Sequence, residues 1–192
     1  MERLIGTEKV KTAVFISGRG SNLRSLIKFS KKKLSPIEIK LIVSNNKKAK
    51  GLFYSKKYKI KKKILNFKKK LNEKKILSIL KSMDIKFICL AGFMSILSKN
   101  FIRQFQGQII NIHPSLLPKY KGLNTHHRVI SAKEKFSGCT VHYVVPKLDS
   151  GKIILQKKVK VKKNETIKSL ERKIIRQEHI IYPKSILKIF SF

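Results

Sequence analysis

The chain has 192 residues, enough for one globular domain with its own core, and its 42% hydrophobic content excludes a disordered chain. Its formal net charge of +36 lies far outside the roughly 2–8 units typical of a small domain and would suit a nucleic-acid-binding protein. However, only seven of the 46 basic residues are arginine, the residue that makes bidentate phosphate and guanine contacts. We therefore interpret the excess as a general lysine bias, which still attracts anionic ligands.

The sequence shows no sign of export or of membrane insertion. Its apolar runs are too short to cross a bilayer, and the first residues lack the apolar stretch of a signal peptide. Cys89 and Cys139 stand singly in apolar runs, without a C-x-x-C spacing. We therefore expect reduced core thiols, a cytoplasmic location and no metal site.

Strand-like and helix-like segments alternate along the chain. Strands are predicted at 12–16, 37–43, 60–64, 87–90, 108–111, 139–145 and 152–161. Helices are predicted around 23–27, 49–57, 76–80, 96–105 and 125–132, and over 166–190 with an interruption at Pro183. This alternation predicts an α/β fold, an open, mostly parallel twisted sheet with helices on both faces. No crossover helix separates the last two strands, so antiparallel strands are expected near the C-terminal end.

No linker or internal repeat stands out in the sequence. Residues 1–192 are therefore predicted to form a single domain, with residues 1–11 as a short N-terminal extension.

The segment Asn111-Ile112-His113 ends the strand predicted at 108–111. An amide and an imidazole two positions apart on an extended backbone point to the same face, and Pro114 and Pro118 stop the strand just beyond them. Open α/β sheets build active sites at such strand ends. The alternative is a buried Asn and His whose hydrogen bonds are made with the backbone.

A glycine-rich turn, Gly18-Arg19-Gly20-Ser21-Asn22, follows the first strand and opens a helix. Its glycines allow close approach of a ligand, and the helix N-terminus favours a phosphate. It is neither a P-loop nor a dinucleotide fingerprint, since the G-K-[ST] ending and the third glycine are missing. The turn is either a monophosphate cradle or a simple tight connection.

Asp149 is one of only two aspartates in the chain and lies in the loop between the last two strands. It is either a turn-forming residue or a carboxylate that returns to the sheet edge and keeps His113 protonated. An Asn, a His and an Asp without a nucleophile indicate direct transfer to a bound nucleophile. The remaining histidines are weaker candidates: at most one of His126 and His127 faces inward, and His142 can be a core residue.

Several motifs occur together and in a fixed order: Ile16–Leu23, Leu90–Met94, Asn111–Pro118, Gly138–His142, Leu148–Gly151 and Gln177–His179. In this order they resemble the phosphoribosylglycinamide formyltransferases, folate-dependent enzymes of purine synthesis. The Asn-Ile-His-Pro-Ser-Leu-Leu-Pro segment alone is shared with methionyl-tRNA formyltransferase and formyltetrahydrofolate deformylase. Those enzymes carry an additional domain, so a length of 192 residues favours the glycinamide enzymes.

The resemblance implies a Rossmann-like formyltransferase fold and an activity. The enzyme would transfer the formyl group of 10-formyltetrahydrofolate, its co-substrate, to the amine of 5-phosphoribosylglycinamide in de novo purine (IMP) biosynthesis. By resemblance, Asn111 would bind the formyl oxygen, His113 would be the general acid, and Asp149 would keep His113 protonated and relay a proton. The substrate-binding residues would be Gly20, Ser21 and Asn22 for the phosphate and Glu178 for the ribose, and the folate-binding residues would be Lys69, Met94, Ser95, Ile96, Leu97 and Asn111.

The chain departs from the family pattern at two of these positions. Ser95 stands where the family usually has a basic residue, and Lys69 stands where it has an arginine. We expect small-molecule substrates, no metal, no specific nucleic acid, no membrane, and a monomer or homodimer. The alternatives are another formyl-folate enzyme, a deformylase or a methionyl-tRNA formyltransferase, and, from a different class, a Lys-rich nucleic-acid-binding module.

Overall fold

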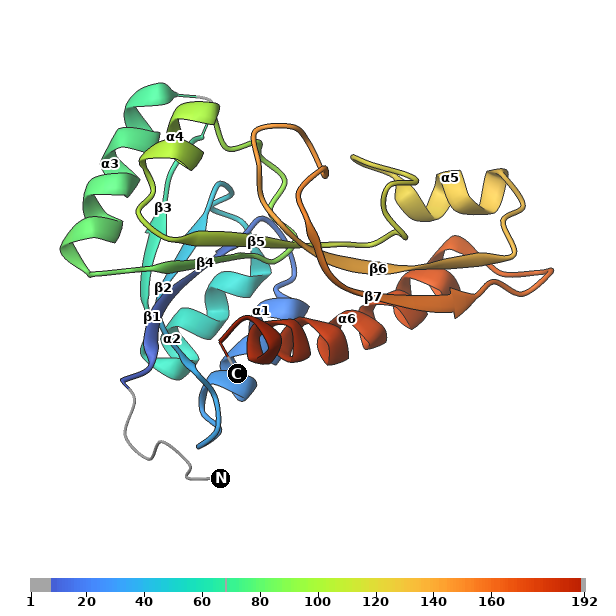
Figure 1. Cartoon of the computed structure of the whole chain (residues 1–192), viewed down its shortest axis with the longest axis horizontal. Coiled ribbons are helices and arrows are strands. Elements are labelled where there is room, and N and C mark those ends of the chain that lie inside the picture. The colour runs from blue at the N-terminus through green and yellow to red at the C-terminus, as the bar shows by residue number, and fades with distance from the viewer. Residues whose placement is uncertain (1–7, 68, 191–192) are drawn as a thin grey trace.

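A computed structural model describes residues 8–67 and 69–190 of the chain, which are built around one seven-stranded sheet. Its strand order is β3-β2-β1-β4-β5-β6-β7 (Figure 1). The bounds are β1 Val10–Ile16, β2 Ile37–Ser44, β3 Lys61–Ile64, β4 Phe87–Leu90, β5 Gln108–His113, β6 Phe136–Tyr143 and β7 Ile153–Lys160. Strands β1 to β5 are parallel, whereas β6 is antiparallel to β5 and β7 to β6. The predicted α/β class and the late antiparallel strands are confirmed.

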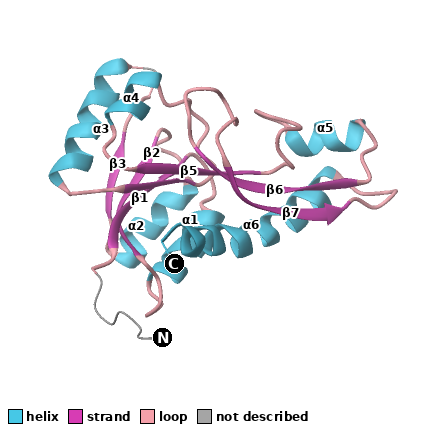
Figure 2. Cartoon of the chain, viewed as in Figure 1, coloured by secondary structure: helices cyan, strands magenta, loops and turns pink. Residues whose placement is uncertain are grey.

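Helices cover both faces of the sheet (Figure 2). Their bounds are α1 Ser21–Ser30, α2 Phe53–Tyr58 after the single turn η1 Lys50–Leu52, α3 Lys70–Ser82, α4 Lys99–Gln104, α5 Thr125–Ser131 and α6 Ile167–Phe190. No helix within residues 8–67 and 69–190 is both long and apolar enough to cross a membrane.

Alternate residues of β1 enter two separate hydrophobic cores. Val14 packs in the core under α1 and α6, and Phe15 packs in the core under α3 and α4. Both side chains are fully buried, as a central parallel strand with helices on both faces requires. The short apolar run that predicted this strand therefore reflects burial on both sides.

Several element boundaries differ from the sequence prediction. Strand β1 begins at Val10, which pairs with Ile37 of β2, so two residues of the predicted 1–11 extension belong to the sheet. Residues 1–7 lie outside the described part of the chain. Strand β6 covers Phe136–Tyr143 instead of 139–145. The single-domain organisation of residues 1–192 stays a prediction.

Helix α4 starts three residues later than predicted because Ser98 caps it. The Ser98 hydroxyl accepts a hydrogen bond from the N–H of Phe101 at 3.0 Å, and the buried carboxylate of Glu73 accepts from the hydroxyl and the N–H of Ser98. The segment before it, 92–98, is consequently a loop.

Helix α6 continues through Pro183, where an interruption was predicted. A proline inside a helix has no N–H for the carbonyl four residues earlier, here that of His179. The hydroxyl of Ser25 on α1 donates to this carbonyl at 3.2 Å. The hydrogen bond from a neighbouring helix replaces the missing one, so the helix continues.

Candidate active site

A pocket of about 650 Å³ lies at the carboxyl ends of β1, β4 and β5. Between β1 and β4 the strand order reverses, and open α/β sheets bind their ligands at this switch point. The lining brings together most of the predicted site residues: Ser21, Asn22, Met94, Ser95, Ile96, Leu97, Asn111, His113, Asp149 and Glu178. Residues far apart in the sequence therefore meet in one cavity.

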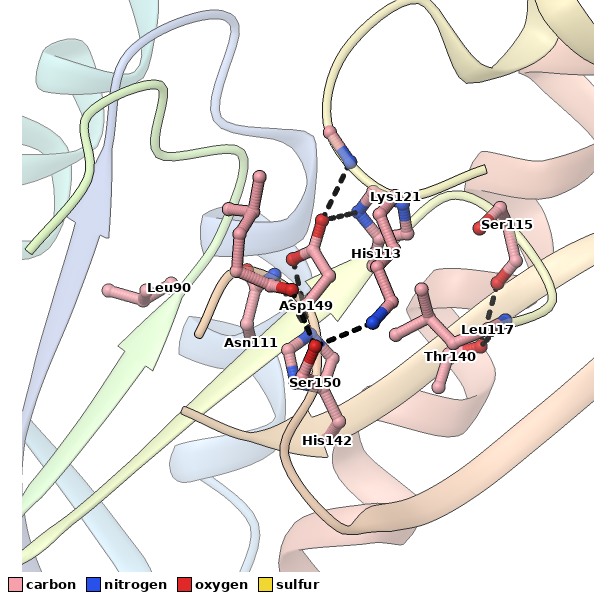
Figure 3. A network of polar contacts seen from close by, with 12 residues as sticks. Leu90, Asn111, His113, Ser115, Leu117, Lys121, Thr140, His142, Asp149 and Ser150 are labelled. Atoms are coloured by element: carbon pink, nitrogen blue, oxygen red, sulfur yellow. Dashed lines mark hydrogen bonds and ion pairs between the residues drawn. The ribbon is translucent and has the colours of Figure 1, made fainter. Parts of the chain in front are cut away.

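His142 of β6 orients Asn111 of β5, which pairs with it across the antiparallel ladder (Figure 3). The Nδ1 of His142 lies 2.8 Å from the carbonyl oxygen of Tyr143, which can only accept, so Nδ1 carries a proton. Burial lowers the pKa of His142, against the raising effects of that carbonyl and of Asp149. The neutral ring then accepts at Nε2 from Nδ2 of Asn111, at 3.2 Å. The second N–H of that amide remains available to a ligand.

His113 lies two residues further along β5, with its side chain 7% exposed. Its Nε2 donates to the carbonyl oxygen of Tyr120 at 2.8 Å. Its Nδ1 lies 3.4 Å from Oδ2 of Asp149. Both ring nitrogens of His113 therefore face acceptors, and a proton on Nδ1 would form a hydrogen bond to the carboxylate. The pair can then hold a proton beside the ligand.

Asp149 reaches the site from the loop between β6 and β7 (Figure 3). Its backbone has a left-handed φ of 44°, a conformation that aspartate tolerates better than most residues. Its Oδ2 accepts from the N–H of Gly122 at 2.8 Å. Nearby, the ammonium of Lys121 donates to the Ser150 hydroxyl at 2.5 Å. The carboxylate is therefore held against a second loop, the one that follows β5.

The glycine-rich turn places the start of α1 at the edge of the pocket. Gly20 has a φ of 74°, and a side chain there would come within 2.7 Å of the Cα of Gly51. Only glycine satisfies both conditions without strain. Ser21 and Asn22, the first residues of α1, line the pocket, whereas Gly20 lies next to its lining.

Glu178 of α6 faces Asn22 across this end of the pocket. Its Oε2 accepts from Nδ2 of Asn22 at 2.8 Å, and the residue is 5% exposed. Burial raises the pKa of Glu178 to about 7, with the hydrogen bond from Asn22 acting in the opposite direction and Glu171 adding to the rise. The Oδ1 of Asn22 is buried and has no hydrogen-bond partner among the described residues. The pair thus presents an unused acceptor and a carboxyl group that ionises near neutral pH.

The opposite wall is the loop 92–98, which is mainly apolar. Met94 and Ile96 are 66% and 73% exposed, and Leu97 is buried beneath them. Lys69 is exposed at the start of α3 and does not belong to the pocket lining, unlike the other predicted folate-binding residues. The apolar surface suits a flat ring system, and the structure does not bring Lys69 to it.

Sequence reasoning underrated His142. His142 lies opposite Asn111 because of the register between β5 and β6. The alternating pattern of residues 139–145 predicted a strand there but not which residues it would pair with. Of the adjacent pair on α5, His126 is half-buried and His127 is exposed, yet both line the pocket, whereas at most one was expected to face inward. Among the described residues, no group of three His, Cys, Asp or Glu side chains could hold a metal ion.

The chain belongs to the formyl transferase family, whose sequence model matches residues 10–186. Among known proteins it is similar to the phosphoribosylglycinamide formyltransferase of Haemophilus influenzae, 41% identical over 177 residues that cover 90% of this chain and 84% of that protein. It is also 40% identical to the trifunctional purine biosynthetic protein adenosine-3 of Gallus gallus over 191 residues. That match covers 97% of this chain, which spans about a fifth (19%) of the trifunctional protein.

Solved structures give the same result. The phosphoribosylglycinamide formyltransferase of Anaplasma phagocytophilum aligns with a TM-score of 0.88 and 41% identity, covering 93% of this chain and 85% of that one. The enzyme of Campylobacter jejuni aligns with a TM-score of 0.89 and 36% identity, covering 97% of this chain and 100% of that one. The predicted family is confirmed, and with it the formyltransferase fold.

Proposed function

We propose that the protein transfers the formyl group of 10-formyltetrahydrofolate to the amine of 5-phosphoribosylglycinamide, in purine biosynthesis. The products are 5-phosphoribosyl-N-formylglycinamide and tetrahydrofolate. The observation that carries this proposal is the convergence of Asn111, His113 and Asp149 in one pocket. Two relatives named phosphoribosylglycinamide formyltransferase, each 41% identical, support this choice of acceptor.

Transfer begins when the neutral amine attacks the formyl carbon and a C–N bond forms. The formyl oxygen gains negative charge, and hydrogen-bond donors held in place stabilise it. The free N–H of Asn111 is such a donor, and the Nδ1–H of protonated His113 would be a second once it turns from Asp149 toward the oxygen. His142 holds the amide in position, and therefore acts on the oxygen only through Asn111.

The protons move between the amine and the folate nitrogen. The attacking amine must lose a proton, and the nitrogen that leaves the formyl carbon must gain one. Asp149 accepts the proton from the amine, directly or through water. His113 donates a proton to the folate nitrogen as the old C–N bond breaks. The contact of 3.4 Å between the two side chains returns the proton from Asp149 to His113, so that the enzyme is ready for another cycle.

The two substrates occupy opposite ends of the pocket. The turn at Gly20, Ser21 and Asn22 would hold the phosphate, where backbone N–H groups and the start of α1 favour an anion. Glu178 would contact the ribose beside it. Met94, Ser95, Ile96 and Leu97 would hold the folate against the apolar wall. A contact from Lys69 would require the exposed start of α3 to move toward the ligand.

The decisive experiment replaces His113 with alanine. We expect kcat to fall by roughly 10²–10⁴, the usual contribution of a general acid, while both substrates still bind in calorimetry. His179→Gln, on α6 outside the pocket lining, is the control for loss of an imidazole and keeps its activity. Near-normal turnover of His113→Ala would contradict the mechanism.

The acceptor is tested separately. The protein is incubated with 10-formyltetrahydrofolate and, in turn, with 5-phosphoribosylglycinamide, charged initiator tRNA, or buffer alone. We expect product only with the first acceptor. Formate release in buffer, or formylated tRNA, would instead identify the other formyl-folate activities. The cytoplasmic location, the monomeric or homodimeric state, and the absence of metal and of specific nucleic acid stay predictions.

A further inference from the structure

A closed ring of polar contacts lies behind the loop 92–98. The N–H of Met94 donates to Oγ of Ser17 at 2.7 Å, and that hydroxyl donates to Oδ1 of Asn45 at 2.6 Å. The Nδ2 of Asn45 donates to Oγ of Ser95 at 2.6 Å. Met94 and Ser95 are adjacent, so the peptide bond between them closes the ring.

The ring joins three neighbouring strands at their carboxyl ends. Ser17 follows β1, Asn45 follows β2, and the Met94–Ser95 pair follows β4, in the sheet order β2-β1-β4. The side chain of Asn45 therefore reaches across the end of β1 to the loop that leaves β4. Among the described residues, one backbone–backbone hydrogen bond joins this loop to the end of β1, from the N–H of Ser17 to the carbonyl of Gly92 at 3.1 Å.

Asn45 joins the two serines of the ring, because its side chain accepts from Ser17 and donates to Ser95. A side-chain amide offers an oxygen and an N–H at fixed separation, so it can bind Ser17 and Ser95 at the same time. An alanine offers neither, and an aspartate offers only acceptors.

The loop is anchored at both ends, since Phe93 packs against Phe15 and Phe67, Leu97 is buried, and Glu73 accepts from the N–H of Ser98, but its middle has no such anchor. Met94 and Ile96 are largely exposed, so apolar burial contributes little there, and Gly92 takes a left-handed φ of 71°. Segments with few buried apolar contacts open easily, and their conformation then depends on hydrogen bonds. The conformation of the exposed middle of this pocket wall, residues 94–96, consequently depends on the ring.

We propose that Asn45 is a positioning residue for the formyl-folate end of the pocket. By fixing Ser17 and Ser95 it sets the loop 92–98 in the conformation that receives the folate. Asn45 does not belong to the pocket lining, so it acts through the loop. The assignment of this end to the folate rests on the function proposed above.

The kinetic test compares Asn45→Ala with the wild-type protein. Loss of the ring should raise KM for 10-formyltetrahydrofolate about five- to tenfold, as expected for one or more hydrogen bonds, and leave kcat and KM for 5-phosphoribosylglycinamide within about twofold. The matched control is Ser82→Ala on α3, whose hydroxyl bonds only the carbonyl of Ile79 in its own helix, and which should change nothing. An unchanged KM for the folate, or an equal rise in both KM values, would overturn the proposal.

A second readout does not depend on the reaction. Amide hydrogen exchange of the protein without substrates should be about five- to tenfold faster at Met94 in Asn45→Ala, because its acceptor Ser17 is no longer held. Unchanged exchange there would also overturn the proposal. If the wild-type protein showed no formyl transfer, the proposed function would fail. The exchange comparison by itself would then decide whether Asn45 positions the loop 92–98.

Discussion

Asp149 and His113 form the central ionic contact of the pocket, with Oδ2 of the carboxylate 3.4 Å from Nδ1 of the ring. The contact is buried, since each side chain is 7% exposed. His113 comes from the end of a parallel strand and Asp149 from the loop between two antiparallel ones. The junction of the two strand types therefore brings the acid and the carboxylate together.

Replacing Asp149 with asparagine removes the negative charge of the side chain and keeps its shape. Asparagine also tolerates a left-handed φ, and its Oδ1 can still accept from the N–H of Gly122. It cannot stabilise the protonated ring of His113 or accept a proton. We expect kcat to fall by roughly 10²–10⁴ with little change in either KM, measured by steady-state kinetics of formyl transfer.

The chain supplies a matched control for this substitution in its other aspartate. Asp84 also has a left-handed φ, of 51°, and its side chain is 61% exposed beside Lys11 and Lys86. Asp84→Asn should keep full activity. If Asp149→Asn behaved in the same way, Asp149 would have no part in the proton transfer.

Glu178 makes stability depend on pH. Its pKa in the folded protein is about 7, above the ordinary value of 4.5, because it is buried. The folded state therefore holds its proton more tightly. Its favourable contribution is complete below about pH 4.5 and is lost as the pH rises to about 7. Glu178→Gln cannot ionise and should not lose this stability. The difference in free energy of unfolding, variant minus wild type, should therefore increase by up to about 3 kcal/mol from pH 4.5 to pH 8.

Urea unfolding at several pH values measures this difference. Glu38→Gln is the control for loss of a carboxylate, since Glu38 lies on β2 with its side chain 49% exposed. Its difference from wild type should change much less over the same pH range. A Glu178→Gln difference that stays constant with pH would mean that the ionisation of Glu178 is not coupled to folding.

The fold was predictable because local patterns determine it. Short apolar runs such as 12–16 and 87–90 alternate with helical periodicity, and these patterns arise from burial that the sequence shows directly. The Asn111–His113 spacing likewise fixed a common face on one strand.

Tertiary partners were not predictable from these patterns. Asn22 and Glu178 bind each other across 156 positions, and Ser25 satisfies the carbonyl that Pro183 leaves free. The late start of α4 depends on Glu73, which holds the capping Ser98. Each of these contacts joins two elements whose relative position only the folded sheet defines.

The lysine excess should destabilise the protein at low salt. With a net charge of +36, like charges repel in the compact state, and added salt screens them because the Debye length falls from about 10 Å at 0.1 M to 3 Å at 1 M. We expect the free energy of unfolding in urea to rise steadily as sodium chloride increases.

A lysine bias without a nucleic-acid role also predicts only weak binding of duplex DNA, lost at physiological salt.

Charge variants on β3 separate screening from other effects of salt. Lys62 lies between Lys61 and Lys63 on this edge strand, and all three are exposed. Lys62→Glu should be more stable than wild type at low salt and gain less from added salt, with Lys62→Gln between the two. Equal salt dependence in all three proteins would exclude repulsion at this cluster. Tight, sequence-independent nucleic-acid binding that persists without any formyl transfer would instead favour a Lys-rich binding module.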